Sequence, residues 1–238
     1  MEAYGVQCKD ASQVLTVYFP SKGKGTAATT TKFNFKDKEV LDLSQYPIEA
    51  YMTYPLNQHH LTTKSHYDII LPLLAERIKT LPYNKDDFEL VPFFAHDGKY
   101  DVSYLKPKKD FRFKIESKGR ILDEHCDFMG LTNINEIHPD NLALDIKTEY
   151  HRLYRASHCC SVVTNETIDN DNKIFISGDS MDIPLVPVLA CYYKEVVMMD
   201  NREGASRKNY YKDKVFDAVI FSCFENNNDN YTFVCNLR

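Results

Sequence analysis

The sequence lacks three features that would identify common classes of protein. No window approaches the roughly 20 consecutive apolar residues of a membrane helix. The first residues, MEAYGVQCKD, lack the charged n-region and apolar h-region of a secretory signal. Basic and acidic residues are interspersed at a net charge of -5, so no basic face is available for a phosphate backbone. We therefore expect a cytoplasmic protein without a transmembrane segment that does not bind nucleic acid.

The cysteines also exclude the usual cysteine-based sites. Their number, seven, is odd, CxxC spacing is absent, and several lie in apolar runs. Reduced, buried thiols fit this pattern, whereas a disulfide framework or a zinc site does not. The hydrophobic content of 43% over 238 residues is enough for a substantial core. We expect one domain over residues 1–238.

Apolar periodicity predicts the first elements of this domain. The run Val14–Phe19 predicts an opening strand. Apolar residues at helical spacing predict a helix over Thr62–Leu81, which Thr62 or Thr63 can cap. Residues 84–135 are rich in aromatic residues and interrupted by Asp-Gly and Pro, which predicts short strands or an irregular excursion.

The last third of the chain predicts strands separated by a helix. Lys173–Ser177, Glu195–Asp200 and Phe216–Phe224 are apolar strand patterns, and Asp182–Tyr193 is an amphipathic helix. Such apolar runs without alternation are typical of parallel strands covered on both faces. We therefore predict an α/β fold, a three-layer α/β/α sandwich with a mainly parallel, flavodoxin-like sheet. A further helix is predicted over residues 146–157.

The turn SGDS follows the first of these strands and precedes the predicted helix. In an open parallel sheet, functional groups collect beyond the carboxyl ends of the strands. A hydroxyl there lies near backbone N–H groups and the positive end of the helix dipole, which stabilise an oxyanion. Gly178 permits the close approach that the turn requires. Ser180 is therefore either a nucleophile or, like Asp179, a cap for the helix.

A nucleophilic serine needs a base within hydrogen-bond distance, and that base needs an orienting partner. Among the eight histidines, His59 and His60 form an adjacent pair directly before the Thr62–Leu81 helix. Adjacent side chains project in different directions, so at most one of the two is the base. A metal pair does not fit, because helical ligands need spacing such as i, i+4 and no acidic residue stands beside them.

Two motifs together resemble a known family. QHHLTTKSHYDIILPLLAERI, followed much later by IFISGDSMDIPLVPVLACYYKEVVMMDNR, resembles the DHHW and alginate O-acetyltransferase branch of the SGNH (GDSL-like) hydrolase superfamily. In that branch an Asp-x-His-Trp signature precedes the serine motif. VLTVYFPSK and FDAVIFSCFENN are similar to the family's first and closing strands, so the resemblance spans nearly the whole chain. It implies the SGNH-hydrolase fold.

The resemblance implies that Ser180 is the nucleophile and His60 the general base. The family's aspartate falls on Gln58, which can accept a hydrogen bond from the imidazole N–H but cannot stabilise imidazolium by charge. Leu61 stands where tryptophan is usual. Three interpretations follow: a slower catalyst that uses the Gln58 carbonyl, an enzyme whose acid comes from elsewhere in the fold, or a degenerate domain without turnover.

The remaining implied roles concern the oxyanion and the substrate. Gly178 and Met181 form the oxyanion turn, and Arg202 and His59 are candidates for substrate binding. The implied activity is serine-dependent O-acetyl transfer to, or removal from, a cell-surface polysaccharide or its precursor. Acetyl-CoA is a candidate acyl donor, we expect no bound cofactor or metal, and a membrane-associated assembly partner is compatible with this activity.

Two other functions stay open on the sequence. One is a catalytically degenerate SGNH-like domain that binds carbohydrate or an assembly partner. Its 16 tyrosines are either stacking surfaces for sugars or ordinary packing residues. The other is a nucleotide-binding, flavodoxin-like protein, which needs a Gly-rich loop after the first strand; SKGKG is a weak version of one.

Overall fold

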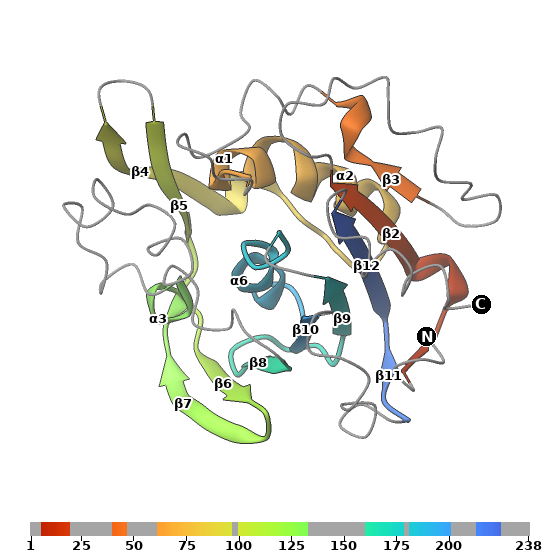
Figure 1. Ribbon diagram of the computed structural model, residues 1–238. Helices are drawn as coiled ribbons and strands as arrows, with labels where there is room; N and C mark the ends of the chain where they lie inside the picture. Colours follow the sequence, from red (N-terminus) through yellow and green to blue (C-terminus); the bar gives the residue numbers. More distant parts are fainter. Residues whose placement is uncertain are drawn as a thin grey trace.

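The computed structural model describes most of the predicted elements (Figure 1). The described residues are 6–19, 40–46, 61–96, 100–132, 160–178, 181–200 and 213–224. The helix predicted over residues 146–157 lies outside them. The fold is α/β, with a core dominated by sheet.

The main sheet has eight strands and is mixed. The predicted parallel arrangement describes only one part of it. In spatial order they are β3 (Val40–Asp42), β2 (Val14–Phe19), β12 (Ala218–Phe224), β9 (Lys173–Gly178), β10 (Glu195–Asp200), β8 (Ser161–Asn165), β6 (Phe113–Ser117) and β7 (Arg120–Cys126). From β3 to β10 every pairing is parallel. From β10 onward every pairing is antiparallel.

Burial explains why the two halves of the sheet differ. Strands β2, β9 and β10 are buried along nearly their whole length, as parallel strands covered on both faces should be. Strands β6 and β8 instead alternate buried and half-buried residues. That alternation is typical of antiparallel strands with one solvated face. The apolar runs predicted the parallel half, whereas the short sequence SVVTN of β8 was not predicted as a strand.

Two apolar clusters lie on opposite faces of the parallel strands. Ile174 and Ile176 of β9 belong to the larger cluster, whereas Phe175 between them belongs to the smaller one. This is the period of two expected of a strand. Among the described helices, those that pack on the sheet contribute to the larger cluster, for example through Leu74 and Leu189. Both faces of the sheet are therefore covered by apolar side chains.

The helix predicted over Thr62–Leu81 is present but shorter. It is built from α1 (Thr63–Ser65), the π-helical turn η5 (His66–Ile70) and α2 (Leu71–Arg77). The Thr62 hydroxyl accepts a hydrogen bond from the Ser65 N–H at 3.2 Å, which confirms the predicted cap. The helix ends early because the Lys79 N–H donates to the Gln13 side chain at 2.7 Å instead of continuing the helical pattern.

The other described helices are short. Helix α6 (Leu185–Ala190) is half the predicted length, and all its residues are buried. A helix that is apolar all round lies inside a protein, and α6 packs against β8 and β10 (Figure 1). Helix α3 covers Phe128–Thr132. No helix among the described residues is long and apolar enough to cross a membrane.

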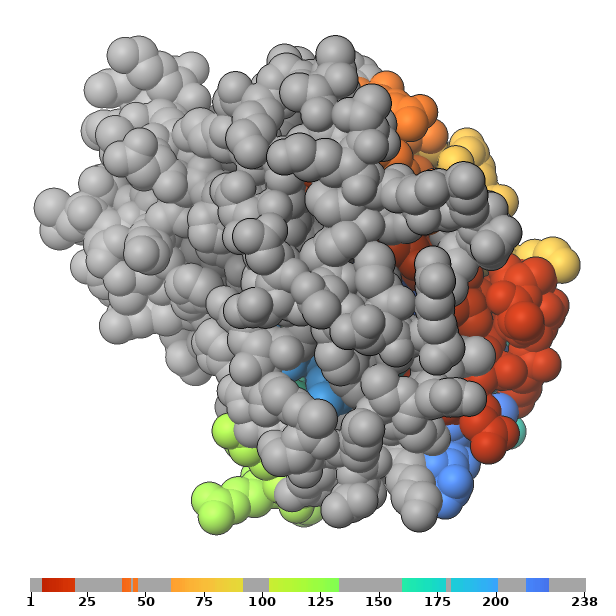
Figure 2. Space-filling model, turned by 45° about the vertical axis from the view of Figure 1, so that its right-hand side comes forward, coloured from red at the N-terminus to blue at the C-terminus, as the bar shows by residue number. Residues whose placement is uncertain are grey.

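The remaining strands form two small sheets. Strands β4 (Phe88–His96) and β5 (Tyr100–Pro107) form an antiparallel hairpin in the region predicted as strands or irregular structure. Strand β1 (Gln7–Cys8) pairs in parallel with β11 (Val215–Phe216). Figure 2 shows these segments, red and blue, side by side on the surface, with the β6–β7 hairpin in green at the lower edge. Single 3-10 turns complete the described structure: η2 (Ala11–Gln13), η3 (Leu43–Gln45) and η6 (Lys85–Asp87).

Candidate active site

The carboxyl ends of the parallel strands meet at one edge of the main sheet. In Figure 1 the arrows of β2, β12 and β9 point to this edge. Gly178, the last residue of β9, is directly opposite Asp200 at the end of β10. On the other side of β9, Phe221 of β12 is opposite Ser177, so Ser222 lies beside Gly178. This is the position at which α/β sheets carry their functional groups.

Gly178 is a glycine because no side chain fits there. A Cβ atom at this position would lie 2.7 Å from Asp182 Cγ and closer still to Asp182 Oδ2 and Ser222 Oγ. Contacts below 3.0 Å do not occur for real Cβ atoms, and both neighbouring side chains are buried. The end of β9 is therefore packed directly against the segment that follows the SGDS turn.

Asp182 and Ser222 form a buried polar pair against Gly178. Their exposed fractions are 0% and 2%, and the Ser222 hydroxyl donates a hydrogen bond to Asp182 Oδ2. A carboxylate taken out of water is costly unless it is hydrogen-bonded. The Asp182 carbonyl also accepts from the Leu185 N–H at 2.9 Å, which begins helix α6. Sequence reasoning missed this pair, and the only signal was an acidic residue placed at the start of an apolar run.

His66 joins the two sequence motifs. Its ring lies between two carbonyl oxygens, with Nδ1 3.0 Å from Thr62 O and Nε2 3.3 Å from Met181 O. Burial lowers the pKa of His66, because an imidazolium would lose its hydration. A neutral imidazole has one N–H, so it donates to one of these carbonyls at a time. His66 was not among the predicted site residues; it connects the start of the helix to the residue after Ser180.

The structure brings together the parts of the two motifs that it describes. Leu61, next in sequence to His60, is 1% exposed and belongs to the same apolar cluster as Met181, which follows Ser180. Gly178 lies at the carboxyl edge, and the carbonyl of Met181 lies 3.3 Å from His66 Nε2. Five predicted site residues lie outside the described residues, and their roles stay predictions: Gln58, His59, His60, Ser180 and Arg202.

No described group of residues forms a metal centre. Within the described ranges, no three His, Cys, Asp or Glu side chains are grouped so that they could hold a metal ion. Among the described cysteines, Cys8, Cys126, Cys160 and Cys191 do not form disulfides.

The chain is an α/β protein with polar side chains at the carboxyl edge of its parallel strands. Comparison with solved structures shows which known proteins share this fold. No protein-family model and no curated protein matches the chain. A crystal structure of a DHHW family protein from Eubacterium siraeum DSM 15702 is similar, with a TM-score of 0.64 over 98% of this chain and 84% of that one. The sequence identity is 14%, so the likeness is one of fold.

PatB1 from Bacillus cereus has a similar fold as well. The structure of PatB1 with a sulfonyl adduct has a TM-score of 0.60 at 14% identity, covering 91% of this chain and 82% of that one. A second structure of PatB1 has a TM-score of 0.59 at the same identity, covering 91% and 83%. The resemblance to the DHHW branch that the motifs indicated is thus supported at the level of fold.

Proposed function

We propose that the chain is a serine-dependent carbohydrate O-acyltransferase or esterase that acts on a cell-surface polysaccharide or its precursor, with acetyl as the acyl group. One observation carries the proposal: His66 Nε2 lies 3.3 Å from Met181 O. This contact joins the helix that follows Gln58 and His60 to the residue that follows Ser180. Nucleophile and base come from sequence motifs far apart, and acyl transfer requires them to meet.

The proposed reaction follows the logic of a serine nucleophile. Ser180 Oγ attacks the acyl carbonyl carbon while His60 removes the hydroxyl proton. The backbone N–H of Ser180 or Met181 donates to the tetrahedral oxyanion, Gly178 providing the tight turn. The leaving group then takes the proton from His60, and an acyl-serine remains. A sugar hydroxyl or water, deprotonated by His60, attacks this ester and frees Ser180.

The fold neighbours support a nucleophile on this scaffold. PatB1 has been seen with a sulfonyl adduct, and sulfonyl groups attach to activated nucleophiles such as an enzyme's serine hydroxyl. The proposal also includes the three-layer α/β/α arrangement of the SGNH-type fold, and the apolar clusters on both faces of the sheet support it. Acetyl-CoA as donor and a cytoplasmic location belong to the proposal as well.

Gln58 is the predicted site residue at which the chain departs from the family pattern, because the family has a carboxylate at this position. In the proposed enzyme the Gln58 carbonyl accepts from the imidazole N–H and fixes the ring orientation without adding charge. The alternative is a non-catalytic domain that binds carbohydrate. The substitution of Gln58 for Asp, together with Leu61 packed into the core at the tryptophan position, favours that alternative.

Turnover of p-nitrophenyl acetate tests the proposal. We expect Ser180→Ala and His60→Ala each to lower kcat by a factor of about 10³ or more, as in other serine nucleophile sites. His125→Ala is the matched control, because His125 is an exposed histidine on β7 paired with Glu166 at 2.9 Å. Gln58→Asp should preserve or raise the rate. Wild-type rates in both Ser180→Ala and His60→Ala would reject the proposed activity and favour the non-catalytic, carbohydrate-binding alternative.

A further inference from the structure

A cavity of about 490 Å³ lies at the opposite edge of the sheet from Gly178. Ile168, in the loop that leads into β9, and Tyr192, just before β10, both line it, so it lies at the amino ends of these strands. Strands of six residues separate the two edges by about 20 Å. The volume is typical of small-molecule sites, and the cavity lies too far from Gly178 to be part of an acyl-transfer site at the carboxyl edge.

The floor of the cavity, formed by Cys191 and Tyr192, is buried and chemically inert. Burial raises the pKa of the Tyr192 phenol, which stays protonated and donates to Asp87 Oδ2 at 2.9 Å. Burial also raises the pKa of the Cys191 thiol. Cys191 is therefore a small apolar wall and not a nucleophile, since a thiol reacts as its thiolate. The floor can hold a ligand but has no group that would react with it.

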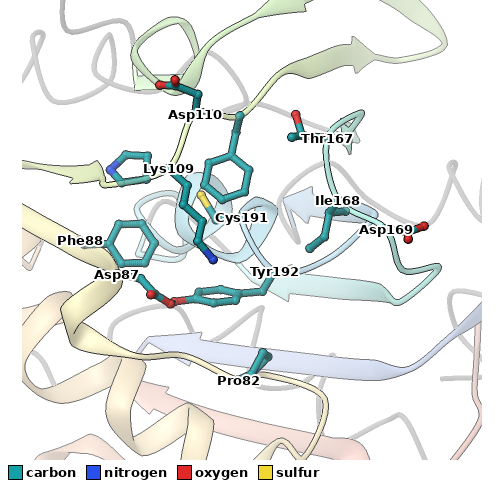
Figure 3. A pocket seen from close by; sticks show the side chains of 12 residues that line it. Pro82, Asp87, Phe88, Lys109, Asp110, Thr167, Ile168, Asp169, Cys191 and Tyr192 are labelled. Carbon is teal, nitrogen blue, oxygen red and sulfur yellow. The ribbon is translucent and has the colours of Figure 1, made fainter.

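Two opposite charges face this floor. Figure 3 shows the Lys109 side chain extending across the cavity toward Tyr192 and Asp87, while the carboxylates of Asp110 and Asp169 point away from it. No described residue forms an ion pair with Lys109. The ammonium group can donate to a ligand, and the Asp87 carboxylate can accept from one.

The walls are apolar and partly aromatic. The Phe88 ring lies beside Asp87 in Figure 3, and Ile168 faces it from the other side. Phe111 also lines the cavity and stacks on Phe113 at 5.9 Å between ring centroids. A flat ring with an apolar face can pack against such walls. The cavity thus combines aromatic surface with the Lys109 ammonium as a donor and the Asp87 carboxylate as an acceptor.

This combination selects among ligand classes. A phosphate or other anion would meet the Asp87 carboxylate, and a simple amine would meet the Lys109 ammonium. A wholly apolar ligand would remove both charges from water without replacing their hydrogen bonds, which is costly. A neutral ring that carries both donors and acceptors satisfies both groups and the walls. Sugars have this chemistry, with hydroxyl groups that donate and accept around a ring with apolar C–H faces.

We propose that this cavity binds sugar units of a neutral glycan, as a second site distinct from the predicted serine site. The binding chemistry follows from Lys109, Asp87 and the aromatic walls; only the choice of a polysaccharide as ligand rests on the proposed function. A site at this distance from Gly178 would hold the polymer at a point remote from the proposed acyl-transfer site at the carboxyl edge. The cavity then contributes affinity for glycan chains and takes no part in acyl transfer.

A ligand-observed NMR titration with chitotetraose and with cellotetraose tests the proposal on the full chain. Lys109→Met removes the ammonium group and keeps most of the apolar stem. Lys108→Met makes the same change at the neighbouring exposed lysine, which does not line the cavity. We expect at least one of the two sugars to bind, and Lys109→Met to weaken binding about tenfold or more, the effect of losing one charged hydrogen bond. Lys108→Met should change it less than twofold.

Asp87→Asn gives a second test, because asparagine keeps an acceptor for Tyr192 and loses the charge. It should also weaken binding several-fold. Absence of binding of both sugars at millimolar concentrations, or equal losses in Lys108→Met and Lys109→Met, would overturn the proposal. The two proposals fail separately. If Ser180→Ala retains both glycan binding and esterase turnover, only the proposed serine-dependent activity is rejected. If turnover depends on Ser180 but neither sugar binds, only the proposed glycan site is rejected.

Discussion

The two edges of the parallel strands are built in opposite ways. At the carboxyl edge, Gly178 lies against Asp182 and Ser222 with no space for even one more carbon atom. At the amino edge, the residues before β9 and β10 surround a cavity of about 490 Å³. Acyl transfer needs reacting groups fixed to within a fraction of an ångström, whereas binding a sugar needs volume. The contrast in packing matches the two functions proposed for the two edges.

The connections of the sheet explain this contrast. At the carboxyl edge, β9 ends at Gly178, and Asp182 from the segment that follows packs directly against Gly178 and against Ser222 of β12. At the amino edge, β8 ends antiparallel to β10, so its loop and the segment before β6 extend beyond the sheet. Thr167 in that loop accepts from the Arg112 N–H at 2.8 Å, which holds the two segments together. The antiparallel strands β8 and β6 therefore place loops beyond the amino edge that border the cavity, whereas the described residues around Gly178 at the carboxyl edge leave no such space.

Gly178→Ala should produce the largest loss of stability, because it adds one carbon at the tightest point of the carboxyl edge. The new Cβ would overlap Asp182 and Ser222, which are buried and cannot move into solvent. We expect the free energy of unfolding to fall by about 4 kcal/mol or more, beyond ordinary overpacking. Urea denaturation measures this change.

Gly119→Ala is the control for that variant. Gly119 is exposed, in the β6–β7 turn, with φ of 74°, so alanine there costs only the left-handed backbone penalty of about 1 kcal/mol. Equal losses in the two variants would mean that the carboxyl edge relaxes as easily as a surface turn. The contrast between the edges would then be wrong.

A pair of isoleucines compares the same deletion at the two edges. Ile183 is 1% exposed in the core just after Met181, whereas Ile168 is half-buried and lines the cavity. Ile183→Ala should lower the free energy of unfolding by about 3 kcal/mol, because it leaves a void among packed neighbours. Ile168→Ala should cost less than about 1 kcal/mol, because it only enlarges an existing space. Similar losses in urea denaturation would indicate that the cavity closes in solution.

Much of the fold, but less of the site, could be predicted from the sequence. Continuous apolar runs predicted β2, β9 and β10, because strands buried on both faces need no other signal. Strand β8 escaped prediction, because five residues of mixed polarity resemble a loop. The helix end at Arg77 escaped as well, because it depends on Gln13, more than 60 residues away. Local pattern determines an element's type, whereas tertiary contacts determine where it stops.

The parts of the site that were predicted depend on local sequence, whereas the parts that were missed depend on long-range contacts. Gly178 was singled out because a strand-to-helix turn needs a close approach, which is a local property. The Asp182–Ser222 hydrogen bond and the His66–Met181 contact join residues 40 and 115 positions apart. No spacing rule connects such pairs. A family resemblance indicated which motifs meet but did not name these residues.

His66 should give the carboxyl edge a modest pH dependence of stability, the smallest of the expected effects. Burial holds the pKa of His66 below its ordinary value of 6.5, so below about pH 6.5 the unfolded chain binds a proton that the folded chain does not. Stability is therefore complete above pH 6.5 and falls as the pH drops toward the lower, folded pKa. The slope from this one group can reach about 1.4 kcal/mol per pH unit.

Urea denaturation between about pH 5 and pH 7.5 measures this slope in the wild type, in His66→Gln and in His125→Gln. Glutamine at position 66 cannot titrate, so the difference in unfolding free energy between wild type and His66→Gln should depend on pH and shrink as the pH falls. His125→Gln makes the same substitution at an exposed histidine on β7 and is the control for the loss of an imidazole outside the core. A constant difference for His66→Gln over this range would show that the His66 ring takes up a proton without losing its place between Thr62 and Met181. In that case both carbonyls would accept from an imidazolium, and the join between the two motifs would be charged rather than neutral.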